Sequence, residues 1–221
     1  MNELNELTTP GATVLWPAFT DPVEAAQSTF RRILKALSEP GTLLQMPHTP
    51  ARTADMQQCL PDAAYCLALT LLDQDTQVWL SPRYRHPDVI ANLRFHCGCK
   101  IINTPGSADF AFVHSSEVTS FSEFSRGTQA YPEKSTSVIF EMESLTAGLA
   151  LQLSGPGIPT VRHHQVKPLQ KNMLQQWYRN QADFPCGIDM YLTCGDKLLG
   201  IPRSTHVQLH EEVVTCASEA V

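Results

Sequence analysis

The sequence predicts an α/β domain with a mixed central sheet flanked by helices. Of its 221 residues, 43% are apolar, which is enough for a sizeable buried core. Amphipathic helical segments alternate with short apolar strands, as in layered α/β proteins. The last predicted strands follow one another without a helix between them, so the sheet is expected to contain antiparallel as well as parallel strands.

The chain is expected to form one continuous domain. No internal repeat and no low-complexity linker interrupts residues 15–209, and glycine and proline occur singly between short periodic segments. Residues 1–14 and 210–221 lack apolar periodicity, so they are predicted to be an N-terminal and a C-terminal tail.

The clearest predicted helix begins after Asp21. Asp21 suits the N-cap, Pro22 suits the first helical position, and Glu24 stands where a capping box places its acid. Pro40 and Gly41 end the helix, and residues 42–46 follow as a strand. The apolar residues at helical spacing, which are expected to form its buried face, are Val23, Ala26, Phe30, Ile33, Leu34 and Leu37.

Helices and strands alternate along the rest of the chain. Further helices are predicted over 62–72, 86–96, 117–124 and 168–180. Further strands are predicted over 76–80, 100–102, 109–113, 135–142, 149–153, 188–193 and 198–201. Pro202 has no N–H group to donate to a strand ladder, so the last strand is expected to end there or to lie at a sheet edge.

Charge and composition argue against several partners. The formal net charge is −6 with both signs interspersed, which gives no electrostatic footprint for nucleic acid or an anionic membrane. No apolar run approaches the roughly 18 residues that cross a bilayer, and the acidic first residues are unlike a secretory signal. The chain has 7 cysteines, and they are scattered along the sequence, as is typical of proteins in a reducing compartment. We therefore expect a cytoplasmic protein without nucleic-acid or membrane partners.

Several segments, read in order, carry a family resemblance. Among them are Phe-Arg-Arg at 30–32, Leu-Ser-Glu-Pro-Gly at 37–41, Leu-Arg-Phe-His at 93–96 and Leu-Ser-Gly-Pro-Gly-Ile at 153–158. The most distinctive block is C-terminal, with Phe-Pro-Cys-Gly-Ile-Asp at 184–189, Thr-Cys-Gly at 193–195 and Ile-Pro-Arg-Ser-Thr-His-Val at 201–207. Over about residues 19–209 the chain resembles the PhnH family, a subunit of the bacterial carbon-phosphorus lyase machinery.

The resemblance implies a fold similar to the large domain of pyridoxal-phosphate (PLP) transferases, without that cofactor. It also implies a homodimer that joins core subunits of the PhnG, PhnI and PhnJ types. The complex forms α-D-ribose 1-methylphosphonate 5-triphosphate from ATP and methylphosphonate and releases adenine, and the displacement is ascribed to another subunit. The expected role is therefore an accessory subunit that is not active alone. The alternative is a stand-alone PLP-dependent or nucleotide-phosphonate transferase.

Two pairs of basic residues are candidate anion-binding groups for a phosphonate or nucleotide. Guanidinium and imidazolium donors suit such anions, and Arg94, His96, Arg203 and His206 supply them near the ends of predicted elements, where α/β sheets collect ligands. The competing interpretation is structural, because arginines commonly pair with carboxylates. In that case Arg94 and Arg203 would pair with Asp73, Asp189 or Glu133.

Two further features are weighed against simpler explanations. An edge strand ending at Ile201, Pro202 and Arg203 is a candidate subunit-docking surface. His96 with Cys97 and Cys99 resembles a metal clip, but the Cys-Gly-Cys spacing is too tight for a zinc knuckle, so packed thiols are favoured and no metal is expected. The lysines lie in polar or helix-surface contexts, which does not favour a Schiff-base lysine.

Overall fold

The computed structural model describes residues 14–117, 120–167 and 171–210. The predicted tails lie almost wholly outside this part of the chain. The helices are α1 (Pro22–Ser38), α2 (Ala54–Cys59), α3 (Asp62–Leu71), α4 (Pro87–Cys97) and α5 (Lys171–Ala182). The strands are β1 (Leu44–Gln45), β2 (Gln77–Leu80), β3 (Lys100–Ile102), β4 (Phe110–His114), β5 (Ser137–Glu141), β6 (Ser144–Ser154), β7 (Arg162–Lys167), β8 (Asp189–Cys194), β9 (Lys197–Ile201) and β10 (His206–Leu209).

The main sheet has 7 strands in the order β1-β9-β8-β5-β4-β2-β3. Strands β8, β5, β4, β2 and β3 are parallel, whereas β9 is antiparallel to both β8 and β1. The predicted mixed sheet is therefore confirmed, and the antiparallel part comes from the late hairpin β8–β9, as the sequence indicated. A second sheet of 3 antiparallel strands has the order β10-β6-β7.

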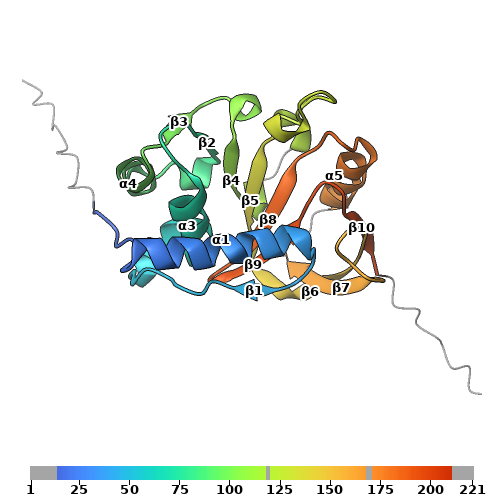
Figure 1. The fold of residues 1–221 in the computed structure, drawn as a ribbon, viewed down its shortest axis with the longest axis horizontal. Coiled ribbons are helices and arrows are strands. Elements are labelled where there is room, and N and C mark those ends of the chain that lie inside the picture. The colour runs from blue at the N-terminus through green and yellow to red at the C-terminus, as the bar shows by residue number, and fades with distance from the viewer. Residues whose placement is uncertain (1–13, 118–119, 168–170, 211–221) are drawn as a thin grey trace, which may run out of the picture.

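One face of the main sheet packs against α1, α3 and α4, which Figure 1 shows together in front of and beside the strands. Because successive residues of a strand point to opposite faces, alternate strand residues meet these helices. They are Val78, Leu80, Phe112, Ile139, Tyr191 and Leu198. From the helices, the fully buried Ala64, Tyr65 and Leu93 complete this core cluster.

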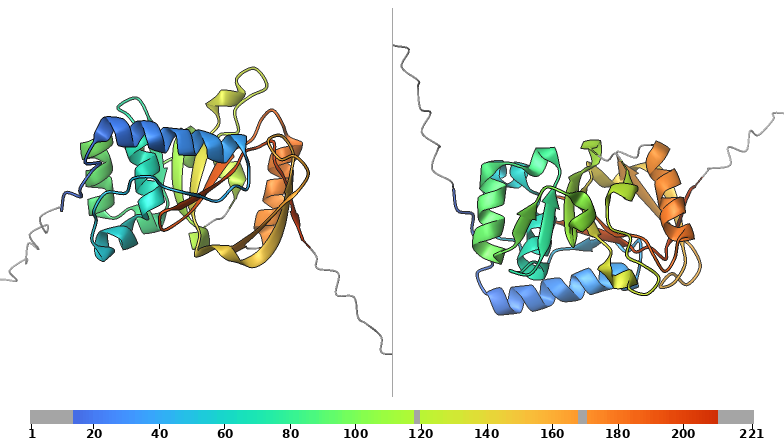
Figure 2. Two further views of the ribbon diagram at one scale, coloured as in Figure 1. Left: turned by 60° about the horizontal axis from the view of Figure 1, so that its bottom comes forward. Right: turned by 90° about the horizontal axis from the view of Figure 1, so that it is seen from above.

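The other face packs against the small sheet and α5. The strand residues on this face include Val113, Val138, Phe140, Leu192 and Ile201. They meet α5 and the small sheet through Trp177, Met173, Leu151, Leu153 and Val207. In the right panel of Figure 2, α1 and α5 lie on opposite sides of the strands. The molecule therefore has three layers, with a core on each side of the main sheet.

The buried face of α1 differs from the prediction. The helix starts as expected, with the Asp21 carboxylate accepting from the N–H groups of Val23 and Glu24. Its buried residues, however, are Ala25, Thr29, Ile33 and Ala36. Val23, Phe30 and Leu34, which the sequence pattern assigned to the core, are exposed, so that part of the prediction is wrong.

The reason is a close approach between α1 and β9. A Cβ atom added to Gly200 would lie 2.3 Å from the carbonyl oxygen of Ala36. Only small side chains fit between backbones this close, so the helix turns its alanine-rich face, with Ile33 as its one large apolar residue, inward and turns Val23, Phe30 and Leu34 outward. Hydrophobic periodicity identifies apolar positions but does not say which of two adjacent stripes faces the chain's own core.

Most other elements match the predictions, with five exceptions. Helix α2 and strands β7 and β10 were not predicted, and β6 is longer than expected. Where a helix over 117–124 was predicted, the described residues form the short 3-10 turns Ser115–Glu117 and Phe121–Glu123. The described helices include none with the length and apolarity needed to span a membrane.

Candidate functional site

The carboxyl ends of the parallel strands form the part of the sheet where a ligand is expected. From β2 the chain continues through α4 to β3 on one side, whereas β4, β5 and β8 lie on the other side of β2. The strand order therefore reverses between β2 and β4. Ligands of open α/β sheets bind outside the carboxyl ends of the strands at such a reversal.

The loops that follow β2 and β4 are tied together at this point by Glu117. Its carboxylate accepts a hydrogen bond from the Ser81 hydroxyl at 2.5 Å and from the backbone N–H of Arg83 at 3.1 and 3.2 Å. Ser81 is fully buried and its hydroxyl oxygen also accepts from the backbone N–H of His114. The strand ends are therefore fixed relative to one another before any ligand binds.

Tyr84 and Glu141 form a second fixed pair at the same edge. The Tyr84 hydroxyl donates to the Glu141 carboxylate at the end of β5. Burial, together with the neighbouring charge of Glu141, raises the pKa of Tyr84 well above its ordinary value. Tyr84 is therefore a neutral donor over the whole physiological range, and it holds the half-buried carboxylate in one orientation.

A hollow of about 390 Å³ opens beside this pair. We call it the carboxyl-edge pocket, and its lining residues are Ala54, Gln57, Gln58, Pro61, Asp62, Arg83, Glu141 and Gly195. Arg83 is exposed, and its guanidinium makes no hydrogen bond or ion pair within the described residues. Glu141 keeps one carboxylate oxygen that accepts no hydrogen bond from the described chain.

Part of the pocket wall is rigid because Asp62 is held by Arg52. Arg52 Nη2 and Nε lie 2.6 and 3.2 Å from Oδ1 of Asp62. The Arg52 side chain has no exposed surface, and its guanidinium lies 4.5 and 5.2 Å from the ring centres of Tyr65 and Trp16. Such stacking on aromatic faces suits a buried guanidinium.

The pocket offers groups that can form hydrogen bonds and an ion pair with a ligand. Arg83 presents a guanidinium to an anion, and Gln57 and Gln58 add amide groups. The Gln57 amide is already oriented, because its Nε2 donates to Asp62 Oδ2 at 2.8 Å. The lining residues include no serine, cysteine, histidine or lysine, so the pocket as described supplies no nucleophile of the kinds these side chains provide.

Arg203, one of the predicted anion-binding residues, is fully occupied inside the protein. Its Nε and Nη2 donate to Asp189, Nη1 donates to the carbonyl oxygens of Pro132 and Pro185, and Nη2 also donates to Ser135. Every N–H group of the guanidinium thus has a partner. Asp189 is one of the carboxylates that the structural interpretation named for Arg203.

The structure does not bring together the two predicted pairs of basic residues. Arg94 and His96 lie on α4, next to the edge strand β3, whereas Arg203 and His206 follow β9 near the opposite edge (Figure 1). Arg94 is exposed, and within the described residues its guanidinium makes no hydrogen bond or ion pair. His96 Nε2 lies 2.9 Å from the carbonyl oxygen of Trp16, and His206 Nε2 lies 3.2 Å from Gln181 Nε2.

The predicted edge strand at Ile201 is an inner strand. It ends before Pro202, as one of the two expected alternatives stated, but β9 lies between β1 and β8. The segment that precedes β1 also covers this edge of β9, because the N–H of Gly41 donates to the carbonyl oxygen of Gly200. The Ile201 side chain is only 1% exposed. The physical basis for docking at Ile201, an open strand edge, is therefore absent from the described chain.

The cysteines near the end of α4 are packed thiols. Cys97 and Cys99 donate to backbone carbonyl oxygens of Ala68 and Leu93. Burial raises the pKa of Cys97 to about 12 and that of Cys99 to about 11, which keeps both protonated at neutral pH. Over the described part of the chain, no three His, Cys, Asp or Glu side chains are grouped to hold a metal ion.

Sequence reasoning missed the residues of the carboxyl-edge pocket. Arg83 and Tyr84 come three and four residues after the predicted strand 76–80, and Glu141 lies at the end of the predicted strand 135–142. Their position just after parallel strands was the available signal. Asp62, by contrast, reaches the pocket through α3, and no local pattern indicates that placement.

The chain is thus a layered α/β protein whose carboxyl-edge pocket presents the guanidinium of Arg83, unpaired within the described residues, beside the oriented carboxylate of Glu141. The model of the family described as "Bacterial phosphonate metabolism protein (PhnH)" matches residues 17–208. The chain belongs to this family.

Two relatives of known name are similar to this chain. One is the "Alpha-D-ribose 1-methylphosphonate 5-triphosphate synthase subunit PhnH" of Rhizobium meliloti (strain 1021), 37% identical over 192 residues that cover 86% of this chain and 94% of the relative. The other is the "Putative C-P lyase subunit protein HtxG" of Stutzerimonas stutzeri, 31% identical over 83 residues, or 38% of this chain and 43% of the relative.

Proposed function

We propose that the chain is an accessory subunit of a carbon-phosphorus lyase complex in phosphonate catabolism. The observation that carries this proposal is the match to a named synthase subunit over 86% of this chain and 94% of that subunit. In this role the chain supports formation of α-D-ribose 1-methylphosphonate 5-triphosphate from ATP and methylphosphonate, with release of adenine. It does so within an assembly that includes core subunits of the PhnG, PhnI and PhnJ types.

The lysines whose side chains the structure describes support an accessory role over a stand-alone PLP-dependent transferase. A PLP-dependent transferase needs a lysine within a cleft to form the Schiff base. Lys35, Lys100, Lys134, Lys167 and Lys197 are all exposed. The mixed sheet is compatible with the large domain of PLP-dependent transferases, and we propose that correspondence for the fold without the cofactor.

We further propose that the carboxyl-edge pocket receives an anionic group of a phosphonate or nucleotide. Arg83 takes the role in anion binding that the sequence assigned to Arg203, because Arg203 has no free N–H group. Arg94 remains a candidate anion contact on α4. The protein acts in the cytoplasm as a homodimer that joins the other subunits.

Co-purification tests the proposed role most directly. The chain is co-expressed with its neighbouring carbon-phosphorus lyase subunits, one of which carries an affinity tag. The expected result is stoichiometric recovery of the chain with the tagged subunit. Adenine release from ATP and methylphosphonate is expected from the complex and not from the purified chain. Adenine release by the chain alone, or a visible absorbance band from bound PLP, would contradict the accessory role.

A matched pair of variants tests the pocket separately. Binding of methylphosphonate or ATP to the isolated chain is followed by nuclear magnetic resonance, with Arg83→Gln compared with the control Arg32→Gln, at an exposed arginine of α1 that has no assigned role. Loss of the ligand-induced shifts in Arg83→Gln alone is expected. Unchanged shifts in Arg83→Gln would remove the pocket from the proposal and would leave the subunit role untouched.

A further inference from the structure

Helix α1 has an apolar face that its own chain does not cover. Val23 is 67% exposed, Phe30 is 45% exposed and Leu34 is 51% exposed. We call these three residues the outer stripe. They lie on one side of the helix because they follow the spacing of helical turns. Exposed apolar side chains grouped in this way, rather than scattered singly, mark an interaction surface.

The outer stripe is distinct from the face that holds α1 on the protein. That inner face consists of Ala25, Thr29, Ile33 and Ala36, all buried. Figure 1 shows α1 lying across the front of the molecule with no element in front of it. The intermediate positions Ala26 and Leu37 are partly buried and connect the two faces. The outer stripe therefore contributes little to the fold of the isolated chain.

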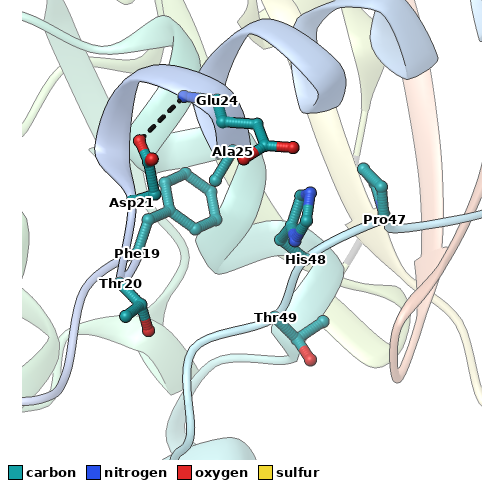
Figure 3. Close-up of a pocket in the computed structure, with 8 residues that line it drawn as sticks. All are labelled: Phe19, Thr20, Asp21, Glu24, Ala25, Pro47, His48 and Thr49. Atoms are coloured by element: carbon teal, nitrogen blue, oxygen red, sulfur yellow. Dashed lines mark hydrogen bonds between the residues drawn. The ribbon is translucent and has the colours of Figure 1, made fainter.

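Two charged residues of opposite sign border the outer stripe. Glu24 and Arg31 are separated by about two helical turns, so they lie along the same edge of the stripe. Both are exposed. Figure 3 shows that the hydrogen bond of Glu24 to Asp21 uses its backbone N–H. Neither the Glu24 carboxylate nor the Arg31 guanidinium has a hydrogen-bond or ion-pair partner in the described chain, unlike Lys35, which pairs with Glu39.

We infer that the outer stripe is the contact surface for a second copy of this chain, with the α1 helices of the two copies packed antiparallel. This inference identifies the surface of the homodimer and rests on that part of the proposed function. A two-fold axis makes the same patch meet itself, so the patch must be complementary to its own reversed copy. The outer stripe and its bordering charges meet this requirement.

The complementarity follows from the positions along α1. In an antiparallel pair centred near Ser28, Phe30 faces the partner's Ala26, a large residue against a small one. Val23 lies opposite a position one residue from the partner's Leu34. Glu24 lies opposite a position one residue from the partner's Arg31, so the two side chains can reach each other. Each contact occurs twice by symmetry, so two ion pairs border one apolar seam.

Other arrangements use the surface less well. In a parallel pair in register, the edge that carries Glu24 and Arg31 would meet the opposite edge of the partner helix, so the two charges would not pair with each other. A partner surface of a single charge would satisfy Glu24 or Arg31 but repel the other. The antiparallel copy satisfies both, and it covers an apolar strip along a helix of 17 residues, about 25 Å long.

The first test measures dimer dissociation of the full chain by sedimentation equilibrium. Phe30→Asp is expected to raise the dimer Kd by about 30-fold or more, because a charge would be buried at the centre of the contact and at both symmetric positions. Tyr178→Asp is the matched control, since Tyr178 is 68% exposed and lies on α5 on the opposite side of the main sheet. An unchanged Kd is expected for it. Equal Kd values for both variants would overturn the inference.

Charge reversal tests the antiparallel arrangement without touching the apolar residues. Glu24→Arg alone and Arg31→Glu alone are each expected to raise the dimer Kd by roughly 10-fold, since each brings two pairs of like charges together. The double variant restores opposite charges and is expected to return the Kd to within about threefold of the original. A double variant as weak as the singles would contradict this arrangement.

Recovery of the variants with a tagged partner subunit distinguishes failure of this inference from failure of the accessory role. If Phe30→Asp leaves the dimer intact but abolishes recovery with a tagged partner subunit, the outer stripe binds that subunit and the inference fails. If the unmodified chain is monomeric but still co-purifies with the complex, the dimer is refuted and the accessory role stands. Circular dichroism of each variant verifies that α1 remains folded.

Discussion

Arg203 and Asp189 form a two-point ion pair in which Nη2 lies 2.5 Å from Oδ2 and Nε lies 3.2 Å from Oδ1. The backbone N–H of Arg203 donates to the same carboxylate at 2.9 Å. The pair joins the residue that starts β8 to the segment that follows β9. Its side chains are 13% and 21% exposed, so the contact is shielded from most solvent.

Replacing Arg203 should destabilise the fold rather than alter ligand binding. Arg203→Ala leaves Asp189 with only the backbone N–H as donor and leaves the carbonyl groups of Pro132 and Pro185 without the guanidinium, so the free energy of unfolding is expected to fall by about 3–5 kcal/mol. Urea denaturation measures this change. Arg94→Ala is the control, because Arg94 is exposed and unbonded, and it should change stability by no more than about 0.5 kcal/mol. A loss below about 1 kcal/mol for Arg203→Ala would contradict the structural role.

The close approach of α1 and β9 predicts a strong effect of one methyl group. Gly200→Ala places a Cβ 2.3 Å from the Ala36 carbonyl oxygen, so the helix or the strand must shift. A loss of about 1–3 kcal/mol in the free energy of unfolding is expected. At Gly195, with nothing within 4 Å of an added Cβ, Gly195→Asn should cost about 1 kcal/mol or less. Equal losses at the two positions would argue against a tight contact at Gly200.

Removing the Tyr84 hydroxyl should show whether it orients Glu141. Tyr84→Phe leaves the half-buried Glu141 carboxylate without its side-chain donor, and a stability loss of about 1–3 kcal/mol is expected. Tyr131 is 55% exposed, so Tyr131→Phe should be nearly neutral. Thermal and urea unfolding both report the difference. Equal stability of the two variants would show that the Tyr84 hydroxyl contributes nothing.

His164 predicts a loss of stability in mild acid. Its Nε2 atom is buried without a hydrogen-bond partner in the described chain. Burial lowers the pKa of His164, the nearby Arg162 lowers it further, and a backbone hydrogen bond at Leu145 partly opposes them. Because His164 resists protonation in the folded protein, the contribution of His164 to stability is present above the unfolded pKa of about 6.5. That contribution is lost as the pH falls below this value.

The measurement is the free energy of unfolding at several pH values between 5 and 7.5. His164 contributes at most about 1.4 kcal/mol per pH unit to the slope. His164→Gln should flatten the dependence by part of that amount, whereas His163→Gln, at an exposed position, should leave it unchanged. An equally steep slope in His164→Gln would exclude His164 as the titrating group.

The sequence predicted the elements that carry strong local signals. Asp21 and Pro22 gave the start of α1, Gly98 ends α4 in a left-handed conformation with φ 71°, and apolar runs gave the parallel strands. Strand β7 was missed because Arg162, His163 and His164 do not read as a strand. They pair with β6, and that partner is known only from the fold.

The site was less predictable than the fold because it depends on which strand ends become neighbours. Arg203 was selected for its chemistry, yet only the fold shows that Asp189 and Pro132 already occupy it. Arg83 and Glu141 are more than 50 positions apart in the sequence, and β2 and β5 meet only through the intervening β4. Residue type predicts possible partners, but strand order decides which of them are available.

Helix α1 packs on the protein through Ile33 and its small side chains, against Gly200 of β9, and its other large apolar residues, Val23, Phe30 and Leu34, point away. This separation leaves the two faces free to evolve at different rates. If the outer stripe pairs two copies of the chain, mutations in it change which chain is recognised while the framework stays the same. In a cell with two related copies of this gene, drift at a handful of outward positions would be enough to keep their products from mixing.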